Sequence, residues 1–200
     1  AGRLRERYHK PSFVLTRGEE GVKGSGRSIE SYSMYEKLCE CKEYLTKFGG
    51  HPMAAGLSLE EENVERFRRK LNEQSGLTEE DLVEKVTIDV PMPIHYIRKD
   101  LVQELSLLEP FGKGNEKPLF AQKNLWISQM RVFGKNRNVV KMRLTDENGY
   151  PMDGVYFGNG DEFAEEGRGK RKISIVYYPD INMYQGRESL QVIIRHYQFE

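Results

Sequence analysis

The sequence has few cysteines and histidines and no long apolar run. Its two cysteines, Cys39 and Cys41, stand two positions apart in a helical pattern, where side chains point about 200° apart, so they cannot bridge or hold a metal together. No apolar stretch approaches the roughly 20 residues of a membrane-spanning helix, and Ala1-Gly2-Arg3 does not begin a signal peptide. We therefore expect reduced thiols and a cytoplasmic protein without membrane contact.

The residues of a hydrolytic centre are also missing. The histidines are scattered singly, with no Asp or Glu around them at metal-ligand spacing: His9, His51, His95 and His196. The acidic run from Asp161 to Glu166 has no histidine partner, and we interpret it as a solvated surface turn. No nucleophile and base stand in a catalytic pattern either. We expect neither a metal site nor a cofactor in this chain.

Charge of one sign is not in excess, since 31 Lys and Arg balance 31 Asp and Glu. Any affinity for nucleic acid must therefore come from the distribution of charge. The clearest asymmetry lies between Ala121 and Thr145, which contains no acidic residue and six cations: Lys123, Arg131, Lys135, Arg137, Lys141 and Arg143. Trp126 and Phe133 are interleaved with them.

The 200 residues are enough for two small domains. In the first half, Leu4 to Tyr8 indicates the end of a helix that starts before the chain, and residues 11–16 predict a short buried strand. Apolar side chains at steps of 4, 3, 4 and 3 predict an amphipathic helix ending at Gly49-Gly50: Met34, Leu38, Cys41, Leu45 and Phe48. Ser58 and Glu61 have capping-box spacing before a second helix that ends near Gly76. We predict an α/β domain over residues 1–76.

The second half is rich in short strands. Residues 77–85 are acidic and poor in apolar side chains, which predicts a linker. Strands are predicted at 86–90, 125–127, 139–144, 152–157, 173–178 and 190–194, with a helix near 98–109. This spacing favours a small closed barrel, an OB-fold over residues 86–200, with a β-sandwich as the alternative. The predicted class is α+β.

Two glycine motifs in the first half are suited to gripping a nucleotide. Beside Gly49 and Gly50 a backbone can approach a phosphate closely, and His51 can donate a hydrogen bond to an anionic oxygen. The alternative is a helix C-terminus with a tight turn, in which His51 hydrogen-bonds a neighbouring carbonyl. Lys23-Gly24-Ser25-Gly26-Arg27-Ser28 predicts a loop that holds a phosphodiester through its serines and Arg27, or a flexible hairpin tip.

The basic stretch of the second half predicts a surface for single strands. Lys141 and Arg143 alternate with apolar residues, so both should project from one outer face of a strand. Cations that follow a backbone, together with aromatic rings on which bases stack, are what single-strand binders use. Arg131 and Trp126 complete the predicted surface. The alternative is a solvated barrel face with Trp126 in the core.

Together these segments resemble the RecJ family of DHH phosphoesterases over the whole chain. The first half is similar to the DHH-associated domain in Ala1-Gly2-Arg3-Leu4, in Lys23 to Ile29, and in Phe48-Gly49-Gly50-His51 with Met53 to Leu57. These blocks also suit oligonucleotide phosphoesterases and part of alanyl-tRNA synthetases. Leu108-Glu109-Pro110-Phe111-Gly112-Lys113-Gly114-Asn115 and Ser189 to Ile194 resemble the RecJ OB domain and narrow the choice.

The resemblance implies the carboxy-terminal part of a 5′-to-3′ single-stranded-DNA exonuclease of recombination and repair. It implies that Gly49, Gly50 and His51 face the scissile phosphate region, and that Ser25 and Arg27 hold the DNA backbone, while Ser28 remains a predicted contact from the loop pattern alone. Mn²⁺ or Mg²⁺ would be bound by an amino-terminal DHH domain outside this chain, which alone should be inactive. Implied partners are single-stranded DNA, that DHH domain, and a single-strand-binding protein or repair helicase. A stand-alone single-strand-binding module remains the alternative.

Overall fold

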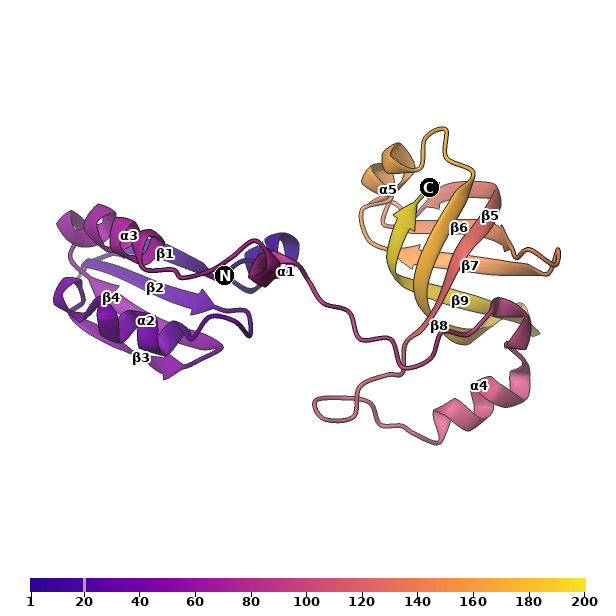
Figure 1. Ribbon diagram of the computed structural model, residues 1–200, viewed down its shortest axis with the longest axis horizontal. Coiled ribbons are helices and arrows are strands. Elements are labelled where there is room, and N and C mark those ends of the chain that lie inside the picture. The colour runs from indigo at the N-terminus through magenta and orange to yellow at the C-terminus, as the bar shows by residue number, and fades with distance from the viewer. Residues whose placement is uncertain (20) are drawn as a thin grey trace. The chain divides into compact units, whose positions relative to one another are not determined.

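The computed structural model describes residues 1–19 and 21–200 and divides the chain into two compact units, Ala1–Lys85 and Val86–Glu200 (Figure 1). The first unit is a sheet with helices, and the second is a closed barrel. The predicted α+β class is therefore confirmed. Each unit is described by itself.

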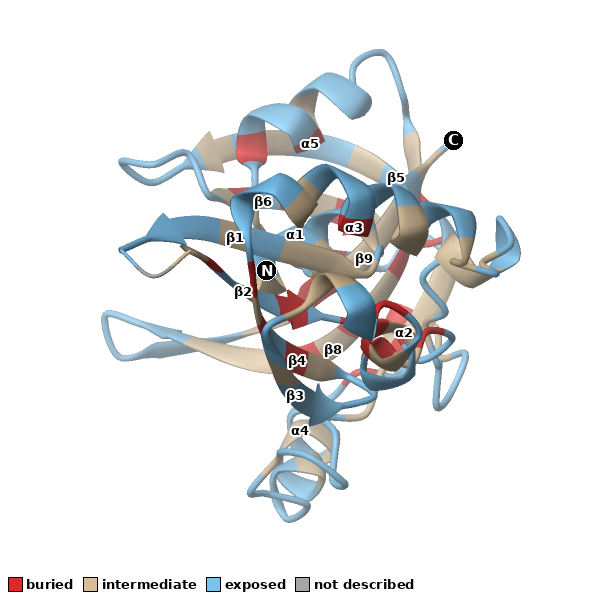
Figure 2. Ribbon diagram, turned by 90° about the vertical axis from the view of Figure 1, so that its left-hand side faces the viewer, coloured by how far each residue is buried: buried red, intermediate tan, exposed pale blue. Residues whose placement is uncertain are grey.

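The first unit is built on a four-stranded antiparallel sheet in the order β1-β2-β4-β3. Its elements are α1 (Gly2–Tyr8), β1 (Ser12–Gly18), β2 (Gly21–Arg27), α2 (Met34–Glu40), η1 (Lys42–Tyr44), β3 (Lys47–His51), β4 (Ala54–Leu59), η2 (Glu61–Asn63), α3 (Val64–Glu73) and η3 (Glu80–Leu82). Along β4 every second side chain is buried, as in a sheet with one covered face (Figure 2). Met34 and Leu38 of α2 and Phe67 of α3 pack in the same core.

The predicted helix from Met34 to Phe48 is too long. It ends at Glu40; a short 3₁₀ turn follows, and residues 47–51 form β3, paired with β4. Leu45 and Phe48 still pack on the core, but from extended backbone. The apolar spacing is therefore satisfied by a short helix followed by a strand. Gly49-Gly50 lies within that strand, so the helix-terminus alternative for this motif is also wrong.

The predicted loop from Lys23 to Ser28 is mostly strand β2, inside the sheet. Gly24 and Gly26 face the core. A Cβ on Gly26 would lie 2.2 Å from the Met34 sulfur, and a Cβ on Gly24 would lie 2.3 Å from a Leu15 methyl. These glycines make room for neighbouring side chains, and neither bends a phosphate-binding loop. The predicted capping box is wrong too, because Ser58 belongs to β4 and α3 begins after Asn63.

The acidic segment after α3 packs on the first unit. Asp81 accepts hydrogen bonds from the Thr78 backbone N–H at 2.9 Å and the Thr78 hydroxyl at 2.8 Å. Leu77 and Leu82 line a cavity of about 480 Å³ together with Phe67 and other side chains of this unit. The few apolar residues of the predicted linker thus have a core to contact.

The second unit is a five-stranded barrel closed in the order β5-β6-β7-β9-β8, with β7 and β9 parallel and the other pairs antiparallel. Its elements are η4 (Ile94–Tyr96), α4 (Lys99–Ser106), β5 (Phe120–Phe133), β6 (Val139–Thr145), β7 (Pro151–Phe157), α5 (Gly160–Glu166), β8 (Lys172–Tyr184) and β9 (Arg187–Phe199). Closure excludes the β-sandwich alternative. The predicted helix near 98–109 corresponds to the shorter α4 (Figure 1).

Two segments of this unit differ from expectation. Residues 86–90 form no strand beyond a single bridge from Val90 to Phe120, since the barrel already closes without them. The acidic run predicted as a surface turn is helix α5, whose second residue is Asp161. The Asn159 side chain accepts from the Glu162 backbone N–H at 3.2 Å, and Phe163 of α5 is fully buried in the barrel core. One apolar anchor and a cap thus make this polar sequence helical.

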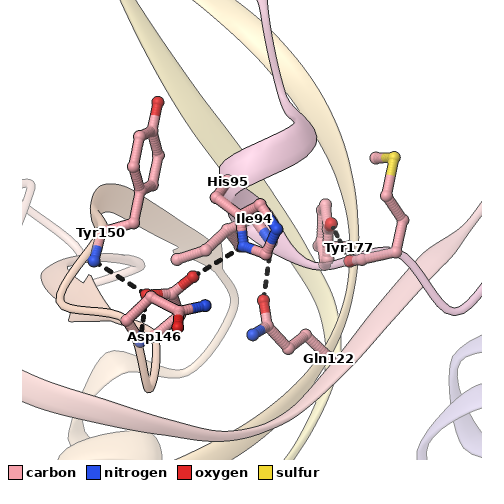
Figure 3. A network of polar contacts seen from close by, with 8 residues as sticks. Ile94, His95, Gln122, Asp146, Tyr150 and Tyr177 are labelled. Carbon is pink, nitrogen blue, oxygen red and sulfur yellow. Dashed lines mark hydrogen bonds and ion pairs between the residues drawn. The ribbon is translucent and has the colours of Figure 1, made fainter.

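The stretch before α4 is fastened to the barrel by polar contacts (Figure 3). The Tyr177 hydroxyl donates to the Met92 carbonyl at 2.6 Å, and the Ile94 N–H donates to the Gln122 side chain at 2.7 Å. Ile94 is also fully buried. This segment therefore keeps a defined position on the barrel without belonging to its sheet.

Candidate functional site

The face of the first sheet that points away from the core of α2 and α3 carries most of the predicted grip residues. Residues directly opposite each other in antiparallel strands share a face. Arg27 lies opposite Ala54, which lies opposite His51, and Ser25 lies in the same way across Gly56 from Gly49. We call this surface the open face and define it by Lys23, Ser25, Arg27, Lys47, Gly49, His51, Ala54, Gly56 and Ser58. With strands about 4.8 Å apart, Arg27 and His51 stand about 10 Å apart at the backbone.

The middle of the open face is a floor of glycine. A Cβ on Gly49 would meet no heavy atom within 4 Å, and one on Gly56 would meet only the Gly24 carbonyl oxygen, at 3.9 Å. The protein itself therefore does not need glycine at these two positions for space. Their lack of side chains lets a ligand approach the backbone closely.

Gly50 has a different role. It faces Ala55 in the register, has φ +152°, and a Cβ there would lie 2.3 Å from the Ala54 carbonyl oxygen. Both the backbone conformation and the close approach require glycine. Of the two neighbouring glycines, Gly49 keeps the open face clear and Gly50 permits the fold.

His51 ends β3 with an exposed ring. Its Nδ1 accepts a hydrogen bond from the Met53 N–H at 3.3 Å. In a neutral imidazole this leaves the proton on Nε2 as a donor. A donor at the rim of a glycine floor, in line with the exposed Arg27 guanidinium, suits the anionic oxygens of a phosphodiester.

The structure separates the predicted serines. Ser25 is exposed on the open face, whereas Ser28 is 1% exposed and its hydroxyl donates to the Tyr32 carbonyl at 2.5 Å. Ser28 is therefore not brought to the open face. Lys47 is an addition that sequence reasoning missed: it shares the face with Gly49 and His51 at strand spacing, a signal hidden by the predicted helix.

The second candidate surface is a shallow groove of about 270 Å³ on the outside of the barrel. We call it the barrel groove; its lining includes Gln129, Arg131, Phe133, Lys141, Arg143, Asp153, Val155, Asn182, Ser189 and Gln191. Arg131 lies opposite Lys141, and Gln129 lies opposite Arg143. The three predicted cations thus gather in one groove, as their alternation with apolar residues indicates.

The cations of the barrel groove are not equivalent. Arg143 donates to Asp153 at 2.5 Å, so its charge is largely neutralised. In the part of the chain that the structure describes, neither Arg131 nor Lys141 forms an ion pair. These two remain able to pair with phosphates.

Aromatic rings border the same outer face. Phe133 and Phe157 are 44% and 60% exposed and lie on either side of Val139 in the register. Trp126 is 46% exposed, with the Lys172 ammonium 4.5 Å from its ring centroid, so its placement in the core is wrong. Phe157 was missed by sequence reasoning, although it continues the alternation of β7.

Metal-ligand clusters and reactive thiols are further candidates for a site in either unit. Over residues 1–19 and 21–200, no three or more His, Cys, Asp or Glu side chains are placed to hold a metal ion. No helix in those ranges is long and apolar enough to cross a membrane. Burial raises the pKa of the Cys41 thiol to about 11, which makes it a poor nucleophile at neutral pH.

Comparisons with known proteins match a different family to each of the two units. The RecJ OB domain family matches residues 88–196, and the DHHA1 domain family matches residues 1–76. The Single-stranded-DNA-specific exonuclease RecJ of Bacillus subtilis is 38% identical over 98% of this chain, and that of Escherichia coli is 33% identical over 97%. The chain spans only 25% and 34% of these two relatives.

A solved structure shares the fold. RecJ of Thermus thermophilus in complex with Mg²⁺ superposes with a TM-score of 0.79 at 24% identity, over 99% of this chain and 29% of that one. The Mn²⁺ complex gives 0.80 with the same identity. Since the RecJ OB domain family alone matches more than half of the residues, the chain belongs to the RecJ family.

Proposed function

We propose that this chain is the carboxy-terminal, substrate-binding part of a 5′-to-3′ single-stranded-DNA exonuclease of recombination and repair. The observation that carries the proposal is the open face, where Arg27 and His51 lie in one row and Gly49 and Gly56 form a bare floor in the row beside it. The relatives named as single-stranded-DNA-specific exonucleases support the substrate class. The barrel groove would bind another part of the single strand.

The proposed role of this chain is to position the phosphodiester of the bound strand. His51 would donate a hydrogen bond to an anionic oxygen of the phosphodiester, Arg27 would hold a neighbouring phosphate, and the glycine floor would let the backbone close in. The neighbours of known structure are complexes with Mg²⁺ or Mn²⁺. The described residues do not fit such a metal. We therefore assign the ion to an amino-terminal DHH domain of the longer protein.

The proposed setting is the cytoplasm, with the DHH domain as the first partner and a single-strand-binding protein or a repair helicase as further ones. A stand-alone binding module is the second candidate, because both binding surfaces lie in these 200 residues. The reading frame upstream separates the two. An Asp-His-His segment there supports the exonuclease, whereas its absence favours the module.

Fluorescence anisotropy of labelled oligonucleotides tests the binding proposal. The 200-residue chain should bind single strands more tightly than blunt duplex of the same length, and affinity should fall as salt rises because phosphate contacts release counterions. With Mn²⁺ added, the chain should release no nucleotides. Equal affinity for duplex contradicts the assignment of the barrel, and metal-dependent cleavage contradicts the assignment of catalysis to another domain.

A further inference from the structure

A cluster of aromatic rings lies where η4 meets the turn between β6 and β7. The His95 and Tyr96 ring centroids are 4.5 Å apart with planes tilted by 36°, and the Tyr150 ring stands edge-on to His95 at 6.5 Å. Tyr96 is 61% exposed and Tyr150 is 37% exposed. We call these three residues the aromatic platform. It lies outside the barrel groove.

The central ring of the platform is held in place from below. Asp146 is buried, and its Oδ2 lies 2.9 Å from His95 Nδ1, while its Oδ1 accepts from the backbone N–H groups of Tyr150 at 2.8 Å and Asn148 at 3.0 Å (Figure 3). Burial acts to raise the pKa of Asp146, but hydrogen bonds from Tyr150, His95 and Asn148 outweigh it and lower that pKa. The carboxylate is therefore charged at neutral pH and fixes the imidazole orientation.

This arrangement favours binding of a flat group. The carboxylate keeps the proton of a neutral imidazole on Nδ1, so the ring does not have to be ordered when a ligand arrives. Tyr96 and Tyr150 have few rotatable bonds, so ordering their rings costs little. The backbone near each is anchored, because the Ile94 N–H donates to Gln122 and the Tyr150 N–H donates to Asp146. Preorganised rings of this kind stack on nucleobases of any sequence.

The platform lies beyond the end of β6, the strand that carries Lys141 and Arg143 of the barrel groove. Lys141, Arg143 and Thr145 alternate along the outer side of β6, and Thr145 lies opposite the exposed Trp126. The next residue, Asp146, begins the turn that carries Tyr150 and contacts His95. At about 3.3 Å per residue, Arg143 and Asp146 are about 10 Å apart along the strand. A nucleic-acid strand leaving the groove along β6 would meet Trp126 and then the platform.

We propose that Tyr96, His95 and Tyr150 form a stacking subsite for bases of single-stranded nucleic acid that extends beyond the barrel groove. The inference rests on the proposed function, because it extends the same bound strand. It predicts that affinity increases with oligonucleotide length past the groove, and that the increase depends on the two tyrosine rings. The affinity of a strand that is short enough to fit within the groove should not depend on these rings.

The test compares thymidine oligonucleotides of about 6 and about 16 nucleotides, within the range of OB-fold site sizes. The double variant Tyr96→Ala with Tyr150→Ala should bind the long strand about 10-fold more weakly and the short one unchanged, since stacking on aromatic rings adds affinity per base. The matched control, Tyr96→Phe with Tyr150→Phe, keeps both rings and should bind both strands like the parent. Thermal unfolding of all three proteins checks that the barrel is intact.

A second readout locates the contact. 2-Aminopurine placed at each position of the long strand should be quenched by stacking at one end only, and the alanine variant should abolish that quenching. Equal binding of the long strand by parent and alanine variant overturns the subsite, as does an equal loss in the phenylalanine control. If the parent binds neither strand, the proposed function fails. If it binds both and the platform variants have no effect, only the subsite fails.

Discussion

The open face and the barrel groove differ in what they offer a nucleic acid. The open face has a glycine floor with a histidine at its rim, and no Phe, Tyr or Trp among its defining residues. The barrel groove has two cations, Arg131 and Lys141, that form no ion pair among the described residues, with Phe133 and Phe157 at its border. The first suits close contact with one phosphodiester, whereas the second suits a strand of several nucleotides.

The two surfaces are therefore expected to contribute to different quantities, the rate of cleavage and the affinity for the strand. Contacts that orient one reacting group act on the rate of the chemical step, whereas contacts along a strand act on affinity. If the comparison holds, substitutions on the open face lower turnover and spare long-strand binding, and substitutions in the groove do the reverse.

The largest expected effect is that of His51→Ala in the full-length enzyme. Removing a hydrogen-bond donor to a charged oxygen at a reacting centre costs about 10²–10³ in kcat, and a loss near the lower end is expected here. Binding of a long strand, measured by anisotropy without turnover, should stay within about twofold because the groove contacts remain. His51→Gln, which keeps an N–H donor, should recover part of the rate. Unchanged cleavage by the alanine variant removes His51 from the site.

A smaller effect distinguishes the two glycines. Gly50→Ala should lower the free energy of unfolding by about 1–3 kcal/mol, because a Cβ would meet the Ala54 carbonyl in a disfavoured backbone conformation. Gly49→Ala should leave the free energy of unfolding unchanged. It should reduce the cleavage rate of the full-length protein about tenfold, because the added methyl would stand where the ligand must approach the backbone. Urea unfolding and single-turnover cleavage measure the two quantities. A destabilised Gly49→Ala protein contradicts the division of roles.

The barrel was more predictable from sequence than the open face, for a physical reason. Residues 139–144 were predicted as a strand and form most of β6, because a half-buried strand alternates apolar and polar side chains. In β2 the core-facing positions Gly24 and Gly26 carry no side chain, so that alternation is invisible. Leu45 and Phe48 satisfied helical spacing although they belong to extended backbone.

Local sequence also could not place the site residues relative to each other. Arg27 and His51 share a row only because β4 lies between β2 and β3, a pairing order that no neighbouring residue determines. The contact between His95 and Asp146 joins positions 51 residues apart. The residue types were predictable from motif and resemblance, whereas their shared surfaces required the register of the folded chain.

The smallest effect tests the groove itself through two cations of equal charge. Lys141→Gln should weaken single-strand binding about threefold and reduce the slope of log affinity against log salt by about 0.7, the value for one phosphate contact on a single strand. Arg143→Gln removes the same formal charge, but its guanidinium is already paired with Asp153, so affinity should fall less. Titrations at several salt concentrations compare the two variants. If Arg143→Gln loses as much affinity and slope as Lys141→Gln, the ion pair does not withhold Arg143 from the strand, and the groove holds three phosphate-binding cations.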